Sequence, residues 1–186
     1  MTPSLAKSPP TVLDSHSVVR ALSEIAETAA ETLELQEVFD RVATSVRRLI
    51  PFDNMGVVRI VDGDRAVLHA ATNMCDGRKL ECLEPIPLTA WSPRMRPRPG
   101  PNPRIDNAPD ELDSSYLIDG RALAGGVRSG MWEPFRPSSE FRGGVWLASY
   151  APSAFTDEHQ RVLRPIAALI GSAVEHWRIW DADRRR

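Results

Sequence analysis

The last third of the chain contains the element that most limits the possible folds. Apolar residues after position 157 recur every three or four positions, as they do on an α-helix. They form two adjacent stripes, one of Val162, Ile166, Leu169 and Ala173, the other of Leu163, Ile170, Val174 and Trp177. Because one stripe is enough to cover a sheet, two stripes indicate that this helix also packs against another helix.

The start of this helix and two earlier helices can also be located. Ser153–Thr156 followed by Asp157 and Glu158 is typical of a helix N-terminus, where a side-chain cap and acidic residues are favoured. Near the N-terminus, an amphipathic helix is predicted from the spacing of Val18, Leu22, Ile25, Ala29 and Leu33. A second helix is predicted over 35–50, and Pro51 ends it.

The segments between these helices have the character of strands. Asn54–Val61 and Arg65–Thr72 are predicted strands, and Asp62-Gly63-Asp64 between them is a hairpin turn signal. Leu83–Leu88 is extended and limited by prolines, and two further strands are predicted over 126–134 and 143–150. Helices at both ends with strand pairs between them predict an α+β fold with a central antiparallel sheet.

Length and charge narrow the class of protein. The 186 residues fit one domain, which we place at 14–180 after a disordered leader at 1–13. The formal net charge of -2 gives no basic field that would indicate nucleic acid or an anionic membrane as partner. No secretory signal and no apolar run long enough for a membrane span occurs in the sequence, so we expect a cytoplasmic protein.

The prolines are concentrated in one segment. Eight of the 16 prolines lie between Pro85 and Pro109, where arginines come first and acidic residues follow. The arginines are Arg94, Arg96, Arg98 and Arg104, and the acids are Asp106, Asp110, Glu111 and Asp113. Two interpretations stay open: an arginine here pairs with a ligand phosphate or carboxylate while Trp91 stacks on it, or the arginines pair with the acids of the same loop.

The order of elements resembles the GAF domain family of small-molecule sensory modules. Leu35–Phe39, Leu49–Asp53 and the strand that follows carry the resemblance in the first half. Gly143–Ser149, Phe155-Thr156-Asp157-Glu158 and the long apolar helix carry it in the second. These residues are fold signatures, and they cover roughly positions 20–180.

The resemblance implies a fold and a way of working. It implies an antiparallel sheet of about six strands, N- and C-terminal helices on one face, and a ligand pocket under loops on the other. Such domains regulate an effector and often dimerise through their terminal helices. The residues expected in those helix contacts are Leu22, Ile25, Ala29, Ile170, Val174 and Trp177. Residues 181–186 are expected to begin an outgoing linker helix, although a basic tail that ends here remains an alternative.

Six residues are candidates for ligand binding. Arg59 and Arg128 are charges inside apolar strands, so they face either the ligand side or an edge. Together with Tyr116 and Trp132 they could form a polar-aromatic pocket, and Trp91 of the proline-rich segment is the separate candidate for stacking on a ligand. His69 is the one histidine in a predicted strand, and it is either a ligand group or a half-buried residue without a special task.

The histidines and cysteines of the sequence do not indicate a metal site or a reactive thiol. His159 and His176 point to different sides of their helix and no metal-binding spacing occurs, so no metal is expected and a cofactor is left unknown. Some GAF relatives reduce free methionine sulfoxide with cysteines or attach a bilin through one. Cys75 and Cys82 lack the surroundings that those relatives show, so we expect spare thiols.

The sequence therefore predicts a non-enzymatic sensory GAF domain. It would bind a small molecule and pass its state through the terminal helices to an effector in signal transduction or transcription regulation. Two alternatives remain: a thiol-dependent reductase of free methionine sulfoxide, and a dimerisation module without a ligand.

Overall fold

A five-stranded antiparallel sheet forms the centre of the computed structural model, which describes residues 15–31, 35–72, 84–99, 104–136 and 143–184. The strand order is β3-β2-β1-β5-β4, so β1 is central and pairs with β2 on one side and β5 on the other. The strands are β1 (Asn54–Val61), β2 (Arg65–Ala71), β3 (Ile86–Pro87), β4 (Ser129–Pro134) and β5 (Gly143–Ser149).

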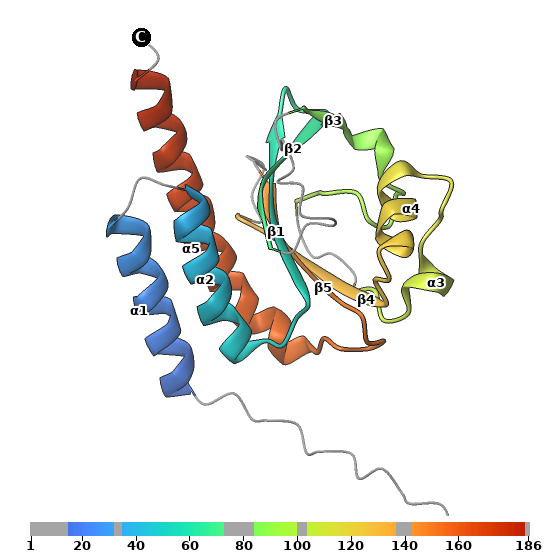
Figure 1. The fold of residues 1–186 in the computed structure, drawn as a ribbon, viewed down its shortest axis with the longest axis horizontal. Helices are drawn as coiled ribbons and strands as arrows, with labels where there is room; N and C mark the ends of the chain where they lie inside the picture. The colour runs from blue at the N-terminus through green and yellow to red at the C-terminus, as the bar shows by residue number, and fades with distance from the viewer. Residues whose placement is uncertain (1–14, 32–34, 73–83, 100–103, 137–142, 185–186) are drawn as a thin grey trace, which may run out of the picture.

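The helices are divided between the two faces of this sheet (Figure 1). The three long helices, α1 (Ser15–Glu31), α2 (Leu35–Leu49) and α5 (Asp157–Arg184), lie side by side on one face. The other face carries a 3-10 helix (Leu88–Ala90), α3 (Ala108–Glu111) and α4 (Leu117–Ala124). None of the described helices combines the length and apolar composition that a membrane span needs.

The predicted helices and the first hairpin are confirmed. β1 has the predicted bounds, and Val61 pairs with Arg65, so that Asp62-Gly63-Asp64 forms the turn between them. Asp62 and Gly63 both have positive φ, a conformation that favours glycine and aspartate in hairpin turns. The predicted cap of α5 is also present: the Thr156 Oγ1 atom accepts the His159 amide, and the His159 Nδ1 atom accepts the Thr156 amide.

The sheet differs from the prediction of about six strands. The described residues contain five strands, and next to β4 there is one isolated bridge in which Ile105 and Gly130 exchange both backbone hydrogen bonds. The bridge does not grow into a strand because α3 begins at Ala108, with Pro109 in its first turn.

The strand predicted over 126–134 begins three residues later, at Ser129. The preceding glycines end α4, an element that the prediction placed in an irregular stretch. Gly126 has φ +82°, its amide donates to Leu123, and the Val127 amide donates to Ala122. This is the Schellman arrangement that ends many helices.

The core between the sheet and the three helices explains the two apolar stripes of α5. Leu163, Ile166 and Ala167 are fully buried, and Ile170 and Val174 are also in this core. The helices that cover the second stripe are α1 and α2 of the same chain, both of which contact α5. We call this side of the sheet the helix face, and the opposite side the loop face.

Candidate ligand-binding face

The loop face carries a second, smaller apolar cluster. Val58, Ala66 and Trp91 are buried in it. Half-buried residues pack around them, namely Ile60, Leu68, Ile86, Leu88, Ala90, Met95, Ile118, Trp132 and Trp146. Successive strand residues alternate between faces, which is why Val57 belongs to the helix-face core and Val58 to this cluster.

Two glycines on the strands make room for two of the three indoles. A Cβ atom on Gly56 would lie 2.4 Å from the Trp146 ring, and one on Gly144 would lie 2.6 Å from the Trp132 ring. Trp132 and Trp146 are directly opposite each other on β4 and β5. The floor of the loop face is therefore a pair of indoles that lie close to the backbone of β1 and β5.

Residues 84–99 and 104–124 lie over this floor, and we call them the roof. A fully buried carboxylate, that of Asp119 on α4, holds the roof together. One of its oxygens accepts the Ser92 amide at 3.1 Å, and the other accepts the Asp113 amide at 3.3 Å. Because Ser92 follows Trp91, this carboxylate fixes where the Trp91 indole enters the cluster.

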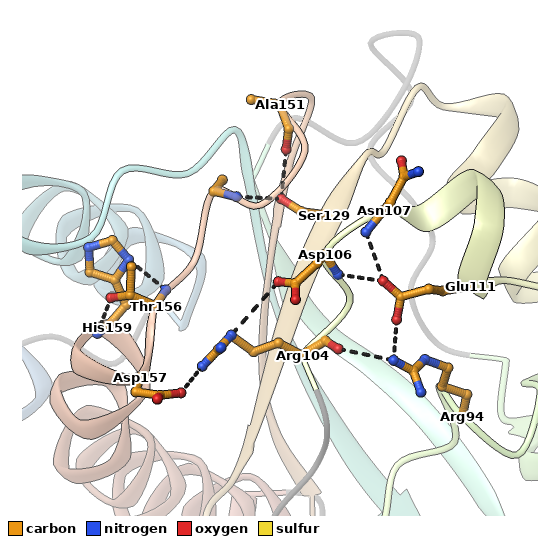
Figure 2. Close-up of polar contacts among 11 residues, drawn as sticks. Arg94, Arg104, Asp106, Asn107, Glu111, Ser129, Ala151, Thr156, Asp157 and His159 are labelled. Atoms are coloured by element: carbon orange, nitrogen blue, oxygen red, sulfur yellow. Dashed lines mark hydrogen bonds and ion pairs between the residues drawn. The ribbon is translucent and has the colours of Figure 1, made fainter. Parts of the chain in front are cut away.

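Arginines and acids of the proline-rich segment pair with each other, as one of the two interpretations anticipated (Figure 2). Arg94 forms an ion pair with Glu111, whose carboxylate also accepts the amides of Asp106 and Asn107 at 2.8 Å each. Burial raises the pKa of Glu111, but these two amides and Arg94 outweigh burial and lower it below its usual value. The acid is thus held as an anion that caps the turn before α3.

Arg104 connects this segment to α5. Its guanidinium pairs with Asp106 and with Asp157, the first residue of α5 (Figure 2). The hydrogen bond and the charge of Arg104 lower the pKa of Asp157. The Ser153 amide, just before α5, donates to the Asp106 carbonyl at 2.8 Å, so the roof and the start of α5 meet at two points.

The structure brings two of the six candidate ligand residues together and places the others apart. Trp91 and Trp132 share the loop-face cluster. Tyr116 is half-buried in the roof at the start of α4. Arg128 lies outside β4 and is exposed, while its backbone pairs with Ser149 and Ala108.

Arg59 and His69 lie away from this cluster. Arg59 alternates with Val58 and Ile60 of the loop-face cluster, and it therefore lies on the helix face. His69 is the extra residue of a β-bulge, since Ala70 pairs with Val57 and Leu68 with Val58. Burial, and then the charge of Arg59, lower the pKa of His69 to about 4.

The residues expected in dimer contacts are placed unevenly. Ile170 and Val174 are buried in the chain's own core, and Leu22 packs against that core. The side chains of Ile25, Ala29 and Trp177 lie outside what the structure describes, as do Cys75, Cys82 and the leader. Among the described residues, no three His, Cys, Asp or Glu side chains are grouped as a metal site would require.

Several residues of the loop face were not anticipated from the sequence. Asp119 and Trp146 carried no signal, because a single acid in an apolar helix and a tryptophan in a strand are both ordinary. Gly56 did carry one, since a glycine inside a β-branched strand often marks a close approach to the backbone.

Solved structures share this arrangement. A GAF domain of a phosphoenolpyruvate-protein phosphotransferase from Coxiella burnetii has TM-score 0.67 at 14% identity, covering 90% of this chain and 98% of its own. A phycocyanobilin-bound GAF domain of a cyanobacterial phytochrome has TM-score 0.62 at 14% identity, covering 87% and 96%. Free methionine-R-sulfoxide reductase from Neisseria meningitidis, in complex with its substrate, has TM-score 0.62 at 15% identity, covering 90% and 95%.

These likenesses fix the architecture. The three-helix layer, the antiparallel sheet and the roof over its opposite face define an α+β domain. More narrowly, the fold is that of GAF domains. No protein-family model and no curated protein sequence matches the chain.

Proposed function

We propose that this chain is a sensory module that binds a small planar molecule on the loop face and passes its state to an effector through the terminal helices. The observation that carries the proposal is the indole floor. Trp132 and Trp146 lie against strands whose glycines admit their rings, and Trp91 of the roof is buried in the same cluster. Indoles offer a flat, polarisable surface on which a planar ligand stacks.

The similar structures support this proposal at the level of fold. One of them is described as holding phycocyanobilin and another as holding its substrate. Both share the overall fold of this chain at TM-score 0.62, so this fold accommodates small molecules in other proteins. An effector linked in the same polypeptide, or a separate partner, would complete the signalling role.

Arg96 is the roof arginine that we propose for an acidic group of the ligand. Arg94 and Arg104 are held by Glu111 and Asp157. The Nε atom of Arg96 is buried and has no hydrogen-bond partner among the described residues. A carboxylate or phosphate of the ligand would supply one.

We also propose dimerisation through the terminal helices, but through other residues than those expected from the sequence. Because Ile170 and Val174 are buried within the chain, a second copy would contact the outer surfaces of α1 and α5. Val19 on α1 is 63% exposed and is a large apolar residue available on that surface. Light scattering at high concentration measures the oligomeric state, and a strict monomer would remove this part.

Ligand binding is tested with defined probes. The absorption spectrum of the purified protein is recorded first, and then tryptophan fluorescence and thermal melting are followed with biliverdin, haem and flavin mononucleotide. We expect at least one probe to quench the fluorescence and raise Tm. Arg96→Ala should weaken that binding by about tenfold or more, and Arg48→Ala, which removes a surface ion pair with Glu24, should not. If none of the probes changes either signal, the choice of ligand class is wrong.

The likeness to the reductase keeps one enzymatic alternative open, although we propose that the chain is not an enzyme. The alternative needs a cysteine thiol, and both cysteines lie outside the described residues. A reductant-coupled assay with free methionine sulfoxide compares the wild type with Cys82→Ser. We expect no turnover by either, and turnover that depends on Cys82 would replace the sensory proposal. Cytoplasmic location stays a prediction.

A further inference from the structure

The first two turns of α5, Asp157–Arg164, are bounded by a proline. Pro165 lies inside the helix and has no amide hydrogen, so the carbonyl of Arg161 lacks its usual helical donor. We call the segment 157–164 the lever. Because this hydrogen bond is missing, the helix is less stable where the lever meets the rest of α5.

One side of the lever is held by polar contacts with the roof and with β4. Asp157 pairs with Arg104, while Gln160 and Arg164 reach the carboxylate of Glu133 on β4. Spacings of three and four residues place these three side chains on one side of the helix. These three contacts lead to the roof and to β4.

Glu133 is an unusual residue for a buried strand position. It is 4% exposed and lies in β4, yet it is an acid. The Arg164 Nε atom donates to one of its oxygens at 2.8 Å, and the Gln160 amide donates to the other at 3.4 Å. The Arg164 side chain is 59% exposed and only Glu133 is buried, so this ion pair lies at the edge of the core and links β4 to α5 there.

Glu133 follows Trp132 on the same strand, and the two side chains lie on opposite faces. Trp132 is part of the indole floor, whereas Glu133 reaches α5. A change in the backbone of β4 that accompanies a new position of the indole therefore also moves the carboxylate that holds the lever.

The side of the lever that faces α1 is loosely packed. An open groove of about 330 Å³ lies there, lined by Ser15, Val18, Val19, Glu158, Arg161 and Val162. The lever thus has ionic contacts on one side, free space on another and a proline at its end. Its inner side carries Leu163, which is fully buried in the core, so a tilt of the lever is limited to a small shift of a packed helix.

We infer that the lever is the conformational element through which the loop face acts on α5, with Trp132 and Glu133 as the connection through the sheet. This inference rests on the proposed sensory function and names the way that its signal leaves the sheet. A ligand that shifts Trp132 alters the hydrogen bonds of Glu133 with Gln160 and Arg164. The lever then tilts about Pro165 toward the groove at α1.

Hydrogen exchange of the full chain, followed by mass spectrometry, tests this without a ligand. The perturbation is Trp132→Phe, and the matched control is Trp146→Phe, because these residues are opposite each other in the same cluster. We expect Trp132→Phe to raise exchange in residues 157–164 by about two- to tenfold, the usual size of effects along a coupled network. Trp146→Phe should leave that segment unchanged.

The connection itself is tested in a second background. In Glu133→Gln, or in Arg164→Gln if the first variant does not fold, Trp132→Phe should no longer change exchange in the lever. Pro165→Ala should lower exchange in the same segment, since it restores the missing helical hydrogen bond. Equal effects of the two tryptophan variants, or an effect of Trp132→Phe that persists without Glu133, would overturn the inference. Neither result would touch ligand binding, which the probe titrations test separately.

Discussion

The two faces of the sheet are packed on different principles. The helix face is covered by three helices, and its core consists of aliphatic and aromatic side chains, many of them fully buried. The loop face has three buried residues in its cluster, and most of the others are half-buried. It relies on glycines that admit indoles and on the carboxylate of Asp119. The first arrangement stabilises the domain, whereas the second leaves side chains that can move aside for a ligand.

The largest expected effect is a loss of stability that differs between the helix face and the loop face. Ile166→Ala removes a fully buried side chain under α5, and we expect a loss of about 4 kcal/mol in the free energy of unfolding. Leu68→Ala on the loop face is the matched change and should lose about 1–2 kcal/mol, because Leu68 is already half-exposed to solvent. Urea denaturation measures both. Equal losses would mean that the loop face is packed as tightly as the helix face.

The second effect concerns the polar anchor of the roof. Asp119→Ala leaves the amides of Ser92 and Asp113 without their acceptor, and we expect a loss of about 3 kcal/mol. Asp119→Asn keeps one acceptor oxygen and should lose roughly half as much. The same denaturation experiment, with near-UV circular dichroism to report on the indoles, checks both. An Asp119→Ala variant with unchanged stability would show that the roof is held by its apolar contacts alone.

The third effect is a pH dependence of stability that arises from His69, the extra residue of the bulge in β2. The pKa of His69 is lowered to about 4, so the unfolded chain binds a proton that the folded chain does not. Stability from this residue is complete above pH 6.5 and is lost as pH falls toward 4, with roughly 2 kcal/mol gone at pH 5.

A His69→Gln variant should flatten the pH dependence of Tm between pH 6.5 and 5. Burial also lowers the pKa of His159, so this residue too destabilises the fold as pH falls. A His159→Gln variant measures its contribution to the pH dependence of Tm. The lowered pKa values of Glu111 and Asp157 act mainly at lower pH. A slope that is unchanged in His69→Gln would mean that this histidine is solvated in the folded state.

The smallest effect tests the floor of the loop face. Gly56→Ala places a methyl group against the Trp146 ring, and we expect a loss of about 1–2 kcal/mol because the half-buried indole can shift. Trp146→Phe in the same chain should recover part of this loss. If the double variant is as unstable as the sum of the single ones, the two residues do not interact.

Local patterns of the sequence were sufficient for most of the fold. The period of α5, the Asp62-Gly63 turn and the caps at Thr156 depend on neighbouring residues, and the structure has all three. The two stripes of α5 predicted that another helix packs against it, and the structure confirms this. The pattern could not show whether that helix belongs to the same chain. In the structure it does, and this buries Ile170 and Val174.

The candidate site was harder to predict because it depends on contacts between distant segments. Trp91 was named from the proline-rich segment and Trp132 from the strand that carries Arg128, and the two share a cluster. Arg59 was expected on the ligand side or at an edge, but alternation along β1 places it on the helix face. Asp119 binds amides 27 and 6 residues away, and no local pattern contains that information.

The central position of β1 has a consequence for the order of folding. β1 and β2 form a hairpin whose partners are close in sequence, whereas the other edge of β1 pairs with β5, with Asn54 opposite Ala148. Closing that long loop is entropically costly, so we expect the pairing of β1 with β5 to come late and to slow folding. Until then the open edge of β1 and the apolar side chains of Met55 and Val57 are exposed to other chains. A strand that is central in the finished domain is therefore open to contact with other chains while the domain forms.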